Sequence, residues 1–289
     1  NSDQTSYYRS SEVEAVIHKA LNYWFTAKPV CLNWWYNQIG IPKTLGTVFI
    51  LFEKQLTPVE KQNAITVMEN AKFGMTGQNK VWLAGNVMMR ALLQNDYELV
   101  KMARDTIASE IVTGGAEGIK DDWCFHQHGA QQQFGNYGLS FVSGMSFFSG
   151  LFSGTSLAFD DKQLNILSTL IDKGYRWVIW KGMMDVNALG RQLFHHAPVH
   201  KALSLAFAAS ELGGGESDEC VAVATALLHD NYPAPAVNVL TGHKHFWQSD
   251  YTIHRRPSWM ASIKMASDRI IGTEMMNGDN MKGYYMADK

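Results

Sequence analysis

The stretch Tyr232-Pro233-Ala234-Pro235 separates two parts of the sequence that differ in hydrophobic pattern. Proline lacks a backbone N–H donor and disfavours helical geometry in the residue before it, so two prolines in four residues end a helical segment. Before this stretch apolar residues recur at helical spacing, and after it short runs alternate between apolar and polar residues. We therefore expect a helical domain over residues 1–235 and the start of a β domain over residues 236–289.

Helix-start signals support the helical part. Thr57-Pro58-Val59-Glu60 combines an N-cap residue, a proline at the first helical position and a glutamate at the third. Ser11-Glu12-Val13-Glu14 is a capping box ahead of an apolar run that reaches Phe25. Further helices are expected over Lys80–Gln94, Tyr97–Val112, Leu139–Phe152, Lys162–Trp180, His200–Glu211 and Asp218–His229. Helices joined by Gly-rich polar loops indicate an α/α toroid or a helical bundle.

The β part begins near Lys244. Alternating runs predict strands over Tyr251–His254, Trp259–Ala266 and Lys282–Met286, with a turn at Asn277-Gly278-Asp279-Asn280. A few strands do not form a stable sheet alone, so they must pack on the helices or continue in chain that is absent here. The end at Lys289 favours the second alternative, and we expect the chain to be a fragment of a longer protein.

Composition excludes several classes of protein. Charged residues make up 18% of the 289 residues and hydrophobic ones 46%, a balance that excludes a disordered chain. The 25 basic and 27 acidic residues give a net charge of −2, which argues against nucleic acid as the main partner. No apolar run is long enough for a membrane span, and Asn1 does not open a signal peptide. Cys31, Cys124 and Cys220 are interpreted as buried free thiols, with one disulfide left open.

Four stretches between the expected helices are rich in polar residues and glycine: Asn33–Pro42, Thr76–Asn79, Phe125–Gly138 and Gly190–His196. Loops on a rigid scaffold are where sites are usually built. The chain also has 9 Trp and 11 Tyr residues, whose rings serve as platforms for sugars as well as core packing. These loops are therefore the candidate functional regions.

Other chemistries fit these loops less well. His126, His128 and the pair His195-His196 raise the possibility of zinc, but no carboxylate or cysteine lies at matching spacing, and we expect no metal site. Asp121-Asp122 is interpreted as a solvated loop or helix cap rather than a calcium site. A glycoside hydrolase needs two carboxylates flanking the bond, and the Gly-rich loops hold no convincing acidic pair.

The loops carry a set of ordered motifs. They are NWWxxxIGxP at Asn33–Pro42, TGxN at Thr76–Asn79, QHGxQxxxGxYG at Gln127–Gly138, GR at Gly190-Arg191, GTExxNGxN at Gly272–Asn280 and KGYY at Lys282–Tyr285. In this order they resemble polysaccharide lyase family 8, which includes chondroitin AC lyases, hyaluronate lyases and xanthan lyases. The resemblance covers essentially the whole chain.

The resemblance implies a fold and an activity. It implies an α/α toroid followed by the first strands of an antiparallel β-sandwich, with the glycan in a cleft of the toroid. The implied activity is β-elimination in a glycan with 4-linked uronic acid. Chondroitin sulfate and hyaluronan are the favoured substrates. Xanthan or another glucuronan, and a non-catalytic protein that binds acidic glycans, remain alternatives. We expect no required cofactor, with a structural Ca²⁺ left open. We also expect an acidic polysaccharide as the partner, a monomer, and a secreted or periplasmic location.

The resemblance also assigns roles to residues. Asn79 would hold the uronate carboxylate, His128 and Tyr137 would handle protons, and Arg191 would lie beside Tyr137. Glu274 would orient Arg191 or His128. The implied substrate-binding residues are Asn33, Trp34, Trp35, Gln127, Asn136, His195 and Asn277. At His195 the chain departs from the family's chondroitin lyases, which tend to carry a second arginine there.

The elimination itself dictates which groups are needed. The proton on C5 is very weakly acidic while the neighbouring carboxylate is charged, so an amide or a cation must neutralise that carboxylate. The Asn79 amide can donate to it and accept from its protonated form. Tyr137 acts as a base only as phenolate, so its pKa must fall from about 10, and the cation of Arg191 favours this form.

Overall fold

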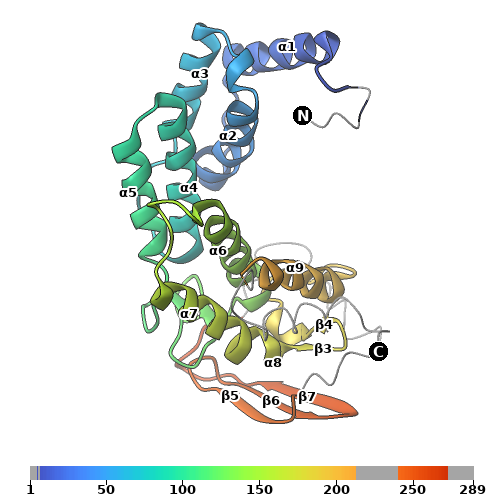
Figure 1. Ribbon diagram of the computed structural model, residues 1–289. Helices are drawn as coiled ribbons and strands as arrows, with labels where there is room; N and C mark the ends of the chain where they lie inside the picture. Colours follow the sequence, from blue (N-terminus) through green and yellow to red (C-terminus); the bar gives the residue numbers. More distant parts are fainter. Residues whose placement is uncertain (1–4, 6, 213–239, 273–289) are drawn as a thin grey trace. The chain divides into compact units, whose positions relative to one another are not determined.

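The structure is a computed structural model that describes residue 5, residues 7–212 and residues 240–272. Contacts divide the chain into two compact units: residues 1–75 with 82–107, and residues 76–81 with 108–289. The described chain is mainly helical up to residue 212, with only two-residue strands, and forms longer antiparallel strands after residue 240, which confirms the expected fold class (Figure 1). Within the described residues, no helix combines the length and the apolar character that a membrane span requires.

The first unit is built from helices around an apolar core. Its helices are α1 (Ser11–Ala27), α2 (Ile41–Leu51), α3 (Pro58–Met68), most of α4 (Gly77–Gln94) and α5 (Tyr97–Ala108), with short turns at η1 (Tyr36–Gly40) and η2 (Glu53–Gln55). Phe49, Met68 and Leu93 are fully buried between them. The sequence did not predict α2, because the polar loop expected over Asn33–Pro42 includes its first residues.

Capping chemistry explains where two of these helices begin. Thr57 Oγ1 accepts from Glu60 N while the Glu60 carboxylate accepts from Thr57 N, which confirms the predicted capping box of α3. The predicted N-cap of α1 was wrong by one residue. Ser10, not Ser11, is the N-cap, and its Oγ accepts from Val13 N at 3.4 Å. α4 begins earlier than predicted, at Gly77, and α5 ends earlier, at Ala108.

The second unit contains the remaining helices. They are η3 (Phe134–Gly138), α6 (Leu139–Phe152), α7 (Asp161–Thr169), η4 (Leu170–Tyr175), α8 (Arg176–Val178), η5 (Val186–Ala188) and α9 (Ala197–Leu212). The prediction of one helix over Lys162–Trp180 was wrong. The chain widens to a π-helix at η4, where Gly174 lets the Trp123 carbonyl approach so closely that a Cβ would lie 2.3 Å from it. Ile179–Trp180 then forms β3, paired with β4 (Met183–Met184).

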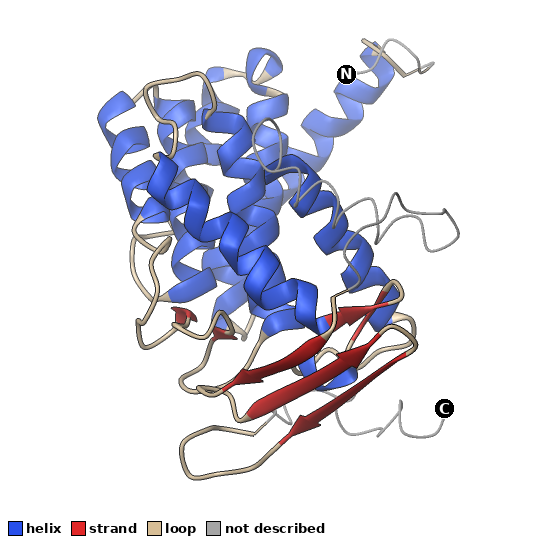
Figure 2. Ribbon diagram, turned by 60° about the horizontal axis from the view of Figure 1, so that its bottom comes forward, coloured by secondary structure: helices blue, strands red, loops and turns tan. Residues whose placement is uncertain are grey.

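The β part of this unit is a three-stranded antiparallel sheet of β5 (Gly242–Phe246), β6 (Tyr251–Arg256) and β7 (Trp259–Lys264), shown in red in Figure 2. β6 and β7 confirm the predicted strands, and β5 was not identified. The sheet packs on the helical part, since Arg255 Nη1 donates to Arg176 O and Tyr251 Oη to Asp185 Oδ2. A smaller hairpin joins β1 (Gly118–Ile119) to β2 (Phe125–His126).

Some predictions fall on residues that the structure does not describe: the helix over Asp218–His229, the strand over Lys282–Met286, the turn at Asn277 and the domain boundary at residue 235. Cys220 lies there too. Of the other cysteines, Cys31 and Cys124 are free thiols. Cys124 is buried as predicted, but Cys31 is only half-buried.

Gly138, the residue after Tyr137, offers a test of packing below the candidate site. A Cβ at Gly138 would lie 2.5 Å from Tyr175 Oη and 2.9 Å from Phe125, although the backbone itself is helical. We therefore expect Gly138→Ala to lower the free energy of unfolding by about 1–3 kcal/mol through overpacking.

Gly150 is the matched control, because it lies in α6 with no atom near its Cβ position. Gly150→Ala should raise the free energy of unfolding by up to about 1 kcal/mol, through helix propensity alone. Urea unfolding followed by circular dichroism measures both. Equal effects of the two substitutions would contradict the packing described for Gly138.

Candidate active site

The centre of the candidate site is a pair formed by Tyr137 and Arg191. Tyr137 lies in η3 and is 5% exposed, while Arg191 lies in the loop between η5 and α9 and is half-buried. Arg191 Nη2 donates to Tyr137 Oη at 2.8 Å, and its Cζ lies 5.3 Å from the centre of the tyrosine ring. A guanidinium that donates to a phenol oxygen stabilises the phenolate form over the phenol.

Two glycines allow the segments of this pair to meet. A Cβ at Gly135 would lie 2.8 Å from the Leu189 Cα, so η3 could not approach this loop with any larger residue. Gly190 has φ +66°, a left-handed geometry that favours glycine, and a Cβ there would lie 2.6 Å from Gln133 Oε1. The glycines therefore set how Tyr137 and Arg191 face each other.

A buried lysine that the sequence analysis missed joins the same two segments. Lys201 of α9 donates to Gly135 O and, at 2.5 Å, to Gln192 Oε1. Burial lowers its pKa to about 8, and no carboxylate of the described chain forms an ion pair with it. The lysine gave no signal in the sequence, because a single lysine in a helix is usually a solvated residue.

His128 lies against Tyr137. The two ring centres are 4.8 Å apart at an interplanar angle of 64°, and His128 is exposed. His126 does not join it, because its Nε2 bonds Ser249 Oγ at 2.9 Å and burial together with Lys120 lowers its pKa to about 4. Within the described ranges no cluster of three metal-ligating side chains occurs. The expectation that the protein needs no metal stays a prediction.

Asn79 lies in the first turn of α4, in the second unit, and is 6% exposed. Its Oδ1 is buried and has no hydrogen-bond partner among the described residues, and the same holds for Asn136 Nδ2 in η3. A buried amide atom without a partner is costly, so such atoms are suited to a polar ligand or to water.

Gln127 connects the Asn79 turn to the His128 turn. It is 1% exposed, and its Oε1 accepts from Gln78 N at 2.8 Å while its Nε2 donates to Thr76 O and to the Glu117 carboxylate. The structure thus uses both ends of this amide inside the protein, although the sequence placed Gln127 among the substrate-binding residues. Glu117 was missed, because a carboxylate in a Gly-rich loop has no motif of its own.

Of the remaining predicted residues of the second unit, the structure describes His195. His195 is exposed, and its ring centre is 3.7 Å from that of His196. Ile271 N donates to Ala130 O, so the chain before Glu274 runs beside the loop of His128. Glu274 and Asn277 themselves lie outside the described residues.

Asn33, Trp34 and Trp35 belong to the first unit. Asn33 Oδ1 accepts from Trp35 N, which caps the turn. Trp34 is 44% exposed, and its role as a stacking platform for sugar stays a prediction. Trp35 is half-buried and packs edge to face on Tyr36 and Trp82, so it contributes to packing, and its substrate-binding role stays a prediction.

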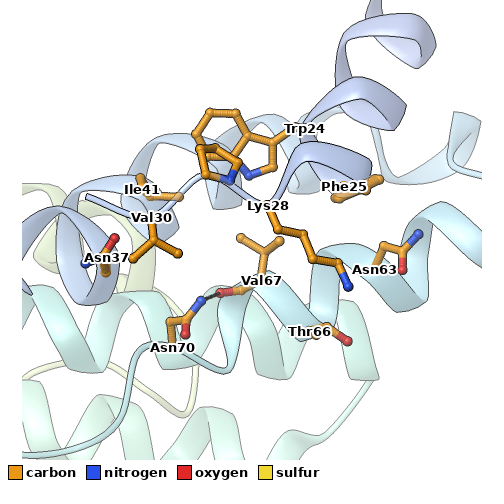
Figure 3. A pocket seen from close by; sticks show the side chains of 11 residues that line it. Trp24, Phe25, Lys28, Val30, Asn37, Ile41, Asn63, Thr66, Val67 and Asn70 are labelled. Carbon is orange, nitrogen blue, oxygen red and sulfur yellow. Dashed lines mark hydrogen bonds between the residues drawn. The ribbon is translucent and has the colours of Figure 1, made fainter. Parts of the chain in front are cut away.

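The first unit also has a pocket of about 320 Å³ between the end of α1, the chain that follows it, and α3 (Figure 3). Trp24, Lys28 and Asn63 lie around it. None of the predicted site residues lines this pocket, and the candidate site is therefore defined by side-chain contacts in the second unit rather than by this cavity.

Comparisons with known proteins identify the family of the chain. Residues 1–210 match the family described as "Polysaccharide lyase family 8, N terminal alpha-helical domain", and residues 241–288 match its "super-sandwich domain". The chain is 29% identical to a chondroitinase-AC of Pedobacter heparinus over 98% of its own length and 41% of that protein's. It is 24% identical to a xanthan lyase of a Bacillus species, over 97% of its length and 34% of that protein's.

Solved structures show the same fold. A chondroitinase AC lyase, solved in complexes with oligosaccharides, superposes with a TM-score of 0.80 at 26% identity, over 93% of this chain and 41% of that one. A chondroitin AC lyase of Streptomyces coelicolor A3 gives a TM-score of 0.82 at 22% identity, over 96% and 45%. The chain thus spans less than half the length of these relatives.

Proposed function

The chain belongs to polysaccharide lyase family 8, and from this premise we propose that the protein cleaves a 4-linked, uronic-acid-containing glycan by β-elimination. One observation carries the proposal: Arg191 donates to the Tyr137 hydroxyl while the His128 ring lies against the same tyrosine. A protein that only bound glycan would have no need of a cation on the oxygen of a buried tyrosine.

The proposed reaction begins with the uronate carboxylate. Asn79 Oδ1 has no partner among the described residues and can accept from a protonated carboxyl group, while the NH₂ of the same amide can donate to the carboxylate. Neutralising the carboxylate lets negative charge develop on it as the C5 proton leaves, which is electrostatic stabilisation of the transition state. We assign this role to Asn79.

The proton transfers follow at Tyr137. As phenolate, Tyr137 Oη takes the proton from C5, the electron pair of that C–H bond forms the C4–C5 double bond, and the bond from C4 to the leaving oxygen breaks. The leaving oxygen then takes the proton from the same hydroxyl, which restores the phenolate. Arg191 stabilises the phenolate before the first transfer and after the second, and His128 serves as a second base or as an orienting group.

For the substrate we propose chondroitin sulfate or hyaluronan first, in line with the relatives named chondroitinase-AC and hyaluronate lyase. Xanthan or another glucuronan is the second candidate, because His195 stands where an arginine would add a fixed bidentate fork for an acidic group. We further propose that the protein acts outside the cell or in the periplasm, as a monomer, and without a required cofactor.

A panel of acidic glycans tests this function. Incubation with chondroitin sulfate, hyaluronan, xanthan and a polyglucuronate should give a rise in near-ultraviolet absorbance for at least one of them, because elimination leaves an absorbing unsaturated uronate. A protein that binds one of these glycans without any rise in absorbance would support the non-catalytic alternative. A rise with xanthan alone would make xanthan the substrate in place of chondroitin sulfate and hyaluronan.

A further inference from the structure

Glu117 accepts hydrogen bonds from two separate turns of the candidate site. Its Oε2 accepts from Thr76 Oγ1 at 2.5 Å and from Gln127 Nε2, and its Oε1 accepts from Gly129 N at 2.9 Å. We call Glu117, Thr76, Gln127 and Gly129 the Glu117 network. Thr76 precedes the helix of Asn79, and the other two donors flank His128 on either side.

The turn of His128 has a backbone geometry that needs such support. His128 has φ 63° and Gly129 has φ 81°, and the left-handed region is unfavourable for a residue with a side chain. Glu117 bonds the side chain before His128 and the backbone N–H after it. The carboxylate therefore stabilises the turn from both sides of the strained residue.

The same network reaches the turn of Asn79 through Gln127. Gln127 Oε1 accepts from Gln78 N, and a Cβ at Gly77 would lie 2.3 Å from that oxygen. Gln127 is oriented by its bond to Glu117, because an amide whose Nε2 is fixed also has its Oε1 fixed. Glu117 thus acts on the backbone beside Asn79 without touching it.

Among the described residues, the Glu117 carboxylate accepts from these three donors. No lysine, arginine or histidine of the described chain forms an ion pair with Glu117. A glutamine at this position would offer one acceptor oxygen, and its NH₂ group would face a donor. The network therefore requires a carboxylate and not merely a side chain of this size.

We propose that Glu117 is a positioning residue for the elimination, whose carboxylate holds the turns of Asn79 and His128 in one fixed arrangement. This inference rests on the proposed function for its effect on catalysis. The network itself stands on the hydrogen bonds above. Glu117 thus acts through its neighbours and does not touch the sugar.

Glu117→Gln tests the effect on catalysis. We expect kcat to fall by about 10- to 100-fold, since a displacement of catalytic groups by about 1 Å has an effect of this size. KM should change by less than about threefold, because ground-state contacts to the glycan remain. Glu98→Gln is the matched control: it makes the same change in an exposed residue of α5 whose pairing with Lys101 is loose, at 3.7 Å.

Amide hydrogen exchange tests the network without any substrate. In Glu117→Gln, the amides of Gly129 and Gln78 should both exchange at least about tenfold faster than in the wild type, while Glu98→Gln should change neither. Gln78 N does not bond Glu117, so its faster exchange requires transmission through Gln127. A purely local structural role would change Gly129 and leave Gln78 as it was.

Thr76→Val covers the case in which Glu117→Gln does not fold, because it removes one donor from an exposed residue. It should give the same changes in kcat and in Gln78 exchange, at smaller size. Unchanged Gln78 exchange together with unchanged kcat, in whichever variant folds, would overturn the inference. A wild-type protein that cleaves no acidic glycan would instead remove the proposed function, and the exchange result would still decide on the network.

Discussion

Tyr137→Phe should lower kcat by about 10⁴-fold while leaving glycan binding nearly unchanged, because one hydroxyl is assigned both proton transfers. The substitution removes only the oxygen that accepts from Arg191 Nη2. Tyr137 is 5% exposed, and its ring centre lies 4.8 Å from that of His128. The phenylalanine ring should keep this place. The measurement is the initial rate of absorbance increase on the best glycan of the panel, together with a binding titration of the same glycan.

Tyr23→Phe serves as the control for this substitution. Tyr23 lies in α1, outside the unit that holds the site, and is 75% exposed. Its loss of a hydroxyl should change neither rate nor binding. If Tyr137→Phe turned over within about tenfold of the wild type, the base would have to be another residue, and His128 would be the next candidate.

Asn79→Ala is expected to have the second largest effect, a loss of about 10²–10³-fold in kcat, which is typical for removal of one donor to a developing oxyanion. Without the amide, the uronate keeps its full charge as the C5 proton leaves. Because Asn79 is 6% exposed and its Oδ1 has no partner among the described residues, the truncation should remove few contacts within the protein.

Asn86→Ala in the same helix separates this effect from loss of stability. Asn86 lies about two turns further along α4, is buried, and donates Nδ2 to Ile39 O at 3.1 Å. Asn86→Ala should lower the unfolding temperature and leave the kcat of the folded protein unchanged. Asn79→Ala should lower kcat and leave the unfolding temperature nearly unchanged. Similar kcat values for the two variants would remove Asn79 from the neutralising role.

The helices were predictable where local chemistry decides them. Thr57 and Glu60 form the capping box that the sequence indicated, and α6 begins and ends where its apolar run does. The π-helices were not predictable, because η3 and η4 depend on tertiary contacts. Gly138 packs under Tyr175, and Gly174 under the Trp123 carbonyl, and neither contact leaves a local signal.

In the candidate site too, residues with a sequence motif were predicted and residues without one were missed. Asn79, His128, Tyr137 and Arg191 were found because their motifs occur in order, and the structure brings three of them into direct contact and links the turn of Asn79 through Gln127. Glu117 and Lys201 were missed, because their roles come from hydrogen bonds to residues distant in the chain. A side chain that supports a site from behind carries no spacing of its own in the sequence.

The central claim is that this protein breaks its glycan by elimination and not by hydrolysis. Cleavage in water enriched in heavy oxygen, followed by mass spectrometry of the products, tests it most directly. Elimination predicts that no heavy oxygen enters either new end and that one product is lighter by a water molecule than its hydrolytic counterpart. Heavy oxygen at the new reducing end, with both products saturated, would contradict the claim and the roles assigned to Tyr137 and Asn79.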